Sequence, residues 1–268
     1  MINTLKAKMQ NKNAKYSDNE VLWLINHIGD PSSEIRDDLV CNSLGNGILD
    51  NKFSRHQVEF LVQTAIKRNL LFYKIDESEE ATLTRTFACL LWNLIFLVTE
   101  DQNSEYFQVL NKNDEQKVID DLISYLRTEH DFTGYSKEYG WVHAIAHCSD
   151  ALEAAIKLIA FSNEQVKSFL EATFDMFNKV DRRFTDEEEY LLADVFITGF
   201  KVGKIDQDQF KDWLKKFTLN PEAGSILELH RFLNLKSFLE DIYVKLNSSD
   251  MLNDGLRKVI ETDYMAVY

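Results

Sequence analysis

The chain has 268 residues and a formal net charge of −14, with 45% hydrophobic and 28% charged residues. These proportions are typical of a folded soluble protein rather than a disordered one. The acidic balance argues against binding to nucleic acid or to anionic membranes, because both depend on clustered Lys and Arg. Two prolines and nine glycines are too few for an all-β or Rossmann-type fold, so the composition indicates helices.

Capping patterns mark helix starts along the chain. In the capping box, a capping residue is followed three positions later by Glu or Gln, and the two side chains satisfy free amides at the helix start. Asp30-Pro31 indicates a further start, with Asp as the N-cap. In chain order the capping pairs are Ser17/Glu20, Ser54/Gln57, Asn113/Gln116, Ser162/Gln165, Thr185/Glu188 and Asp206/Gln209. No alternating pattern predicts a strand.

These elements predict an all-α fold of about a dozen helices joined by short links. Short polar links, such as Gly29-Asp30, place consecutive helices antiparallel to one another. No exact repeat period is visible. We therefore expect an irregular, right-handed, HEAT-like α-solenoid or helical array, and we expect residues 1–268 to form a single domain because no low-complexity linker interrupts them.

Apolar segments and cysteines indicate the cellular compartment. The most apolar run, residues 87–98, is too short to cross a bilayer and predicts a buried helix. Residues 1–18 lack the apolar segment of a secretory signal, so we expect a cytoplasmic protein. Neither a disulfide framework nor a cysteine-rich zinc site is expected from three widely spaced cysteines, Cys41, Cys89 and Cys148.

Charged residues lie at two of the predicted helix starts. Arg85 precedes the most apolar helix, where an arginine usually pairs with a carboxylate. We expect structural pairing rather than anion binding, with partners among Asp37, Asp38, Glu129 and Asp131. The acidic run 186–189 lies in the first turn of its helix, where the helix dipole favours negative charge, and is predicted to be solvated.

Two histidines and an aspartate form a stripe in the segment 140–150. If this segment is helical, His143, His147 and Asp150 are spaced i, i+4 and i+7 and lie along one side. Trp141 is expected on the core side of the same helix. An apolar stripe runs along the opposite side, formed by Ile145, Leu152, Ile156 and Ile159. The histidines are therefore expected to face a cleft or a concave surface.

The stripe has three interpretations, which the sequence leaves open. Two histidines one turn apart can bind a divalent ion such as zinc, with Asp150, or a carboxylate of Glu129 or Asp131, as a further ligand. Ala144 follows His143, so the general-base Glu of the HExxH zinc proteases is absent. In the second interpretation the histidines cap or hydrogen-bond neighbouring helix ends. In the third they form a metal-free ligand or acid–base site.

Several motifs together resemble a bacterial family known only as a domain of unknown function. The matching motifs are Arg36-Asp37-Asp38, Arg85-Thr86-Phe87, Glu129-His130-Asp131, Gly134-Tyr135 and the block from Gly140 to Asp150, Gly-Trp-Val-His-Ala-x-Ala-His-x-x-Asp. The chain departs from the family at Thr133, where the family has arginine, and at Cys148-Ser149, where it has smaller residues. The resemblance implies an all-helical, HEAT-like fold and transfers no activity. It marks as supporting site residues Arg36, Asp37, Arg85, Glu129 and Asp131.

The sequence supports two classes of function. The first is an interaction or ligand-binding module that uses the concave face of the array, with a protein partner, since helical arrays usually bind. The alternative is a metal-dependent hydrolase in which His143, His147 and Asp150 hold the metal and a bound water is the nucleophile. We favour the first class because the sequence offers no identifiable general base.

Overall fold

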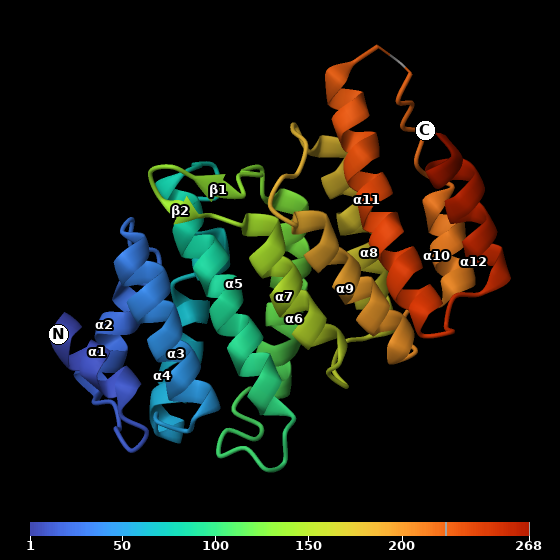
Figure 1. Cartoon of the computed structure of the whole chain (residues 1–268). Coiled ribbons are helices and arrows are strands. Elements are labelled where there is room, and N and C mark those ends of the chain that lie inside the picture. Colours follow the sequence, from blue (N-terminus) through green and yellow to red (C-terminus); the bar gives the residue numbers. More distant parts are fainter. Residues whose placement is uncertain (223, 268) are drawn as a thin grey trace.

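The computed structural model describes residues 1–222 and 224–267, and these residues are almost entirely helical (Figure 1). The α-helices are α1 (Ile2–Gln10), α2 (Asp18–Asn26), α3 (Asn42–Leu49), α4 (Arg55–Lys67), α5 (Glu80–Thr99), α6 (Lys112–Thr128), α7 (Ala144–Ile156), α8 (Asn163–Lys179), α9 (Glu188–Lys201), α10 (Gln207–Leu214), α11 (Ile226–Ser248) and α12 (Asp254–Val259). Two π-helical segments, η1 (Glu34–Cys41) and η3 (Ile260–Tyr264), and two 3₁₀ segments, η2 (Leu70–Phe72) and η4 (Met265–Val267), complete the helical structure. The predicted all-α class is confirmed.

Alternate helices pack against one another in two rows. In one row α1 contacts α3, α3 contacts α5, α5 contacts α7, α7 contacts α9 and α9 contacts α11. In the other row α2 contacts α4, α4 contacts η2, η2 contacts α6 and α6 contacts α8. The helices consequently lie side by side in chain order, with the two termini at opposite ends of the molecule (Figure 1).

A short antiparallel hairpin interrupts the helices and was not predicted. It consists of β1 (Tyr135–Ser136) and β2 (Gly140–Trp141), in which Tyr135 pairs with Trp141. Two residues per strand are too few to produce a period-2 pattern that could be recognised in the sequence. The hairpin lies at the same edge of the molecule as the start of α5 (Figure 1).

Most of the predicted helix starts are confirmed. Capping boxes are formed at Ser17, Ser54 and Ser162, and Asp206 accepts hydrogen bonds from two amides at the start of α10. The prediction was wrong at Asn113/Gln116, at Thr185/Glu188 and at Asp30-Pro31, after which η1 begins at Glu34 with Ser33 as the N-cap. Helix α6 begins earlier because the side chain of Asn111 already accepts from the amides of Asn113 and Asp114, and α9 begins after Glu187, which adopts a left-handed conformation.

Helix α5 lies at the centre of the packing and contacts α3, η1, η2 and α7. Among the described residues it is the one helix whose length and hydropathy would suit a membrane span, but 72% of that window is buried inside the protein. This burial agrees with the predicted core helix. The apolar stripe of α7 is buried as predicted except at Ile159, which is 90% exposed because α7 ends at Ile156.

Candidate functional site

Arg85 is fully buried and forms an ion pair with Glu129, which is also fully buried. Its Nε lies 2.8 Å from Oε2 of Glu129, and its Nη2 lies 3.1 Å from Oε1, so the pairing is bidentate. This confirms the predicted structural pairing and selects Glu129 among the predicted partners. Glu129 also accepts hydrogen bonds from the main-chain amides of His130 and Asp131, which fixes the carboxylate from a second side.

The remaining donors of Arg85 hold the loop that leads into α5. The guanidinium donates to the carbonyl oxygens of Tyr73 at 3.0 Å, Lys74 at 3.1 Å and Glu77 at 3.0 Å. Asp131 fixes the end of this loop by accepting from the amide of Glu79 and the hydroxyl of Thr82. Burial alone would raise the pKa of Asp131, but these hydrogen bonds hold it below its usual value, so this carboxylate is ionised.

Arg36 has a similar role beside α5. It is fully buried, pairs with the neighbouring Asp37, and lies over the Phe87 ring at 4.8 Å. Its donors reach the carbonyl oxygens of Asp30 at 3.0 Å, Pro31 at 3.5 Å, Tyr139 at 2.6 Å and Trp141 at 3.3 Å. Arg36 therefore ties the turn after α2 to the β-hairpin.

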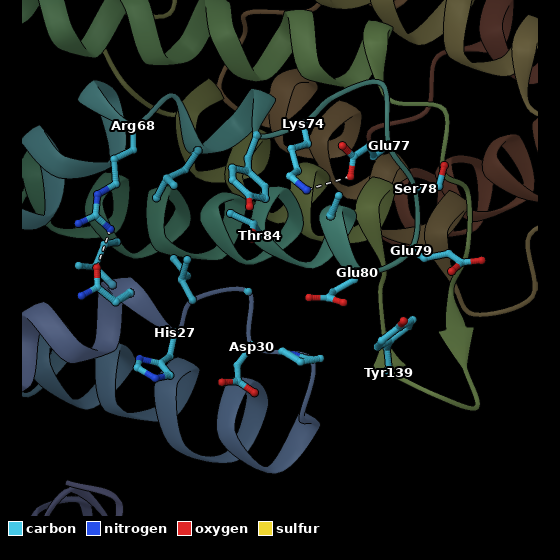
Figure 2. A pocket seen from close by; sticks show the side chains of 18 residues that line it. His27, Asp30, Arg68, Lys74, Glu77, Ser78, Glu79, Glu80, Thr84 and Tyr139 are labelled. Carbon is cyan, nitrogen blue, oxygen red and sulfur yellow. Dashed lines mark hydrogen bonds and ion pairs between the residues drawn. The ribbon is translucent and has the colours of Figure 1, made fainter.

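The loops held by the two arginines form the walls of a cavity of about 740 Å³ (Figure 2). One wall is the end of α2 and the following turn, the opposite wall is the loop 73–80 with the first turn of α5, and Tyr139 of the hairpin closes one side. Six of the seven carbonyls that accept from Arg36 or Arg85 belong to residues that line this cavity, and the seventh is that of Trp141. The supporting residues predicted from the sequence thus shape a pocket without lining it.

Carboxylates dominate the charge of the pocket. Asp30, Glu79 and Glu80 line it, and none of the three makes an ion pair within the described residues. In Figure 2, Asp30 and Glu80 lie on opposite walls. Of the two lining cations, Lys74 pairs with Glu77 at 3.1 Å, whereas Arg68 donates to the neutral side chain of Asn26 at 2.7 Å and keeps its charge. Three unpaired carboxylates therefore outnumber one unpaired guanidinium.

The predicted histidines lie against α5 and outside this pocket. His143 is the N-cap of α7, in a left-handed conformation with φ of 48°, and its carbonyl accepts from the amide of His147. Nδ1 of His147 lies 2.9 Å from the hydroxyl of Thr86, which donates to the carbonyl of His143 at 3.3 Å. The hydroxyl of Thr86 thus bridges the ring of His147 and the main chain of His143. Burial, followed by the nearby charges of His143 and Arg36, lowers the pKa of His147 to about 3, so the ring is neutral.

Asp150 does not join the two histidines in a metal site. The imidazole rings of His143 and His147 are 5.6 Å apart, whereas the charged neighbours of Asp150 are Glu153 and Asp194. Burial is the main cause that raises the pKa of Asp150 to about 6. Across residues 1–222 and 224–267, no three His, Cys, Asp or Glu side chains are placed together so that they could hold a metal ion. The capping and hydrogen-bonding interpretation of the histidines agrees with this geometry.

Two further expectations about this region were wrong. Trp141 is 44% exposed, because it lies in β2 rather than in a helix, and its ring packs against Tyr135 and His143. The acidic run is not solvated throughout, since Glu188 is 2% exposed and Glu189 is 3% exposed. Glu189 pairs at 2.7 Å with Arg183, six residues earlier, and the more distant Gly134 packs tightly against Glu188.

Sequence reasoning missed the pocket itself. Most of the residues that line it come from the loop 73–80, the turn 27–31 and Tyr139. The one pattern recognised there, Asp30-Pro31, indicates a helix start and not a pocket. The sequence contained one indirect signal. Arg36 and Arg85 each precede apolar helical residues, which indicates burial, and a buried guanidinium needs several hydrogen-bond acceptors. A buried arginine without enough carboxylates predicts main-chain carbonyls as its partners, and hence a fixed loop.

A family model described as a protein of unknown function, DUF2785, matches residues 71–244. The matched segment contains Arg85, Glu129, Asp131 and both histidines, whereas Arg36 lies outside it. No curated protein and no solved structure matches the chain.

Proposed function

The chain belongs to the DUF2785 family of proteins of unknown function, and we propose that it is a binding module whose ligand occupies the pocket at the start of α5. The volume of about 740 Å³ is in the range of small-ligand sites. It also suits a single side chain presented by a protein partner.

The observation that carries this proposal is that two buried arginines donate hydrogen bonds to the main chain of the pocket walls. Burying an arginine is costly unless its donors are satisfied. Arg36 and Arg85 are both fully buried, and together they fix six carbonyls of pocket-lining residues. Loops held in this way lose little conformational entropy when a ligand binds, so the pocket is preorganised. Simple loop packing would not require both arginines to converge on one cavity.

The charges in the pocket favour a ligand that carries a cationic group. Asp30, Glu79 and Glu80 are the ionisable groups left without a paired cation, and Tyr73 and Tyr139 add aromatic surface. The dipole of α5 does not make an anion site here, because Glu79, Glu80 and Asp131 already place carboxylates at that helix end. The net charge of −14 adds a long-range attraction for a cation.

The scaffold in this proposal is an irregular, HEAT-like solenoid. The packing of alternate helices in two rows supports this interpretation, since each helix contacts mainly its near neighbours. We do not propose the metal-dependent hydrolase, because the structure brings together only two of its three predicted ligands, His143 and His147.

Ligand-observed NMR with a fragment library, half cationic and half anionic or neutral, tests the proposal. Glu80→Trp places an indole in the pocket at an exposed helix start, and Asp76→Trp is the matched control on an exposed loop residue that does not line the pocket. We expect saturation-transfer signals mainly from cationic fragments, lost in Glu80→Trp and kept in Asp76→Trp. Fragments that bind Glu80→Trp as well as wild type, or an absence of binding to wild type, would refute the proposal.

A further inference from the structure

A second cavity, of about 670 Å³, lies at the other end of α5. It is bounded by the last residues of α5, the loop before α6, the first turn of α6 and the loop between α7 and α8. Its lining includes Glu100, Phe107, Leu110, Glu115 and Ile159. It shares no residue with the pocket at the start of α5, so the two cavities can bind ligands independently of each other.

Glu115 is a buried carboxylate that lacks a partner. Its exposure is 9%, and it forms no side-chain hydrogen bond or ion pair with any residue that the structure describes. The other buried glutamates all have partners: Glu20 pairs with Lys8, Glu129 with Arg85, Glu189 with Arg183, and Glu188 accepts from the amide of Asp186. Glu115 lines the cavity, and its unpartnered oxygens are not among the side-chain atoms sealed inside the described protein, so they open toward that space.

A buried carboxylate without a directly bonded partner is costly, and the charge of Lys112 offsets only part of that cost, since the pKa of Glu115 is still raised. Lys112 also lines the cavity, but its amine forms no ion pair with Glu115 and its side chain is exposed. Glu100 adds a second negative charge, and burial together with this charge raises the pKa of Glu115. A cation inside the cavity would supply the missing partner.

The rim of the cavity is apolar. Ile159 is 90% exposed, the most exposed of the large hydrophobic residues within the described chain, and Phe107 is half-buried beside the cavity. The exposure of Ile159 does not result from a loose loop, because its amide donates to Oε1 of Glu100 at 2.8 Å. A fixed apolar rim above a buried carboxylate matches a ligand with an apolar stem and a charged end.

We propose that this cavity binds a protonated primary amine on a short apolar stem, with Glu115 pairing with the amine and Ile159 and Phe107 contacting the stem. A free alkylamine and the side chain of a lysine share this chemistry. A carboxylate or a phosphate is disfavoured, since two glutamates line the cavity and Lys112 is its one lining cation among the described residues.

Isothermal titration calorimetry with matched probes tests the proposal. The probes are n-hexylamine, 1-hexanol and hexanoate, which share a stem and differ in the end group, and N-acetyl-lysine methylamide as the peptide form. Glu115→Gln removes the charge at nearly constant volume, and Glu164→Gln is the control because Glu164 is exposed in the first turn of α8. Glu115→Gln also removes an unpaired buried charge, so it should be at least as stable as wild type by thermal unfolding.

In the Glu80→Trp background, which removes cation binding at the first pocket, we expect saturable binding of hexylamine, weakened about tenfold or more by Glu115→Gln and unchanged by Glu164→Gln. A preference between hexylamine and the lysine derivative then identifies the source of the amine. Equal binding of 1-hexanol would show an apolar cavity without amine recognition and overturn the proposal. Absence of amine binding, or equal binding with and without Glu115→Gln in that background, would overturn it as well.

Discussion

Replacing Arg85 by methionine tests whether the buried ion pair holds the wall of the pocket. The change leaves Glu129 charged in a fully buried position and removes the donor of three loop carbonyls. Removing one partner of a buried pair costs about 3–5 kcal/mol. Each carbonyl that water cannot reach adds about 1 kcal/mol. With all three carbonyls counted, we expect a loss of about 6–8 kcal/mol, a large fraction of the ~5–15 kcal/mol typical of a domain.

Urea unfolding followed by circular dichroism measures this loss in a double-mutant cycle with Glu129→Gln. That single variant should lose about 3 kcal/mol, because glutamine keeps an oxygen for the amides of His130 and Asp131 but offers Arg85 no charge. The double variant should lose about 2 kcal/mol less than the sum of the single losses, since it leaves no unpaired charge. Strict additivity, or a loss below about 1 kcal/mol for Arg85→Met, would refute the reasoning.

Three further predictions concern a packed glycine and two titrating groups. Gly29→Ala places a Cβ about 2.6 Å from the main chain of Thr84 and should cost about 3 kcal/mol of stability. The matched change Gly45→Ala, in α3 with open space around it, should instead stabilise the protein by about 0.5–1 kcal/mol. Urea unfolding of the two variants measures both effects. The folded pKa of Asp150, about 6, is above its usual 3.8. The unfolded chain therefore loses this proton at a lower pH than the folded protein, so stability falls as the pH rises from 3.8 to about 6 and stays lower above pH 6. Asp150→Asn should raise the melting temperature at pH 7.5 and leave it unchanged at pH 3.5. The folded pKa of His147, about 3, is below its usual 6.5, so stability falls as pH drops from 6.5. Between pH 7 and pH 5, the free energy of unfolding of His147→Gln should fall by about 2 kcal/mol less than that of wild type, as measured by urea titration. An equal fall in both proteins would show that burial of the His147 ring does not cause the pH dependence.

Local chemistry explains what could be predicted from the sequence. A capping box involves residues three positions apart, so Ser17, Ser54 and Ser162 could be recognised without tertiary information. The pairing of Arg85 could be predicted because a guanidinium that enters an apolar helix needs a carboxylate. The choice of Glu129 over Asp37 required the structure.

The rest depended on residues far apart in the chain. The pocket combines Asp30, Glu80 and Tyr139, and no local pattern brings these three together. Glu115 lies in the first turn of α6, where an acidic residue normally indicates a solvated helix start, so its burial could not be inferred. The same rule failed for Glu189, which is buried by its pairing with Arg183.

The link between Arg36 and the hairpin has a consequence for folding. Packing between alternate helices joins segments that are close in sequence, and such contacts form quickly. The hydrogen bond from Arg36 to Tyr139 instead joins residues 103 positions apart, whereas Arg85 and Glu129 are 44 positions apart. The contact of Arg36 therefore closes a longer loop, at a greater cost in chain entropy. The turn after α2 and the hairpin are thus expected to open before the helical rows separate, which native-state hydrogen exchange would report as early exchange of the amide of Val142. A bound ligand that bridges the two walls would slow that exchange.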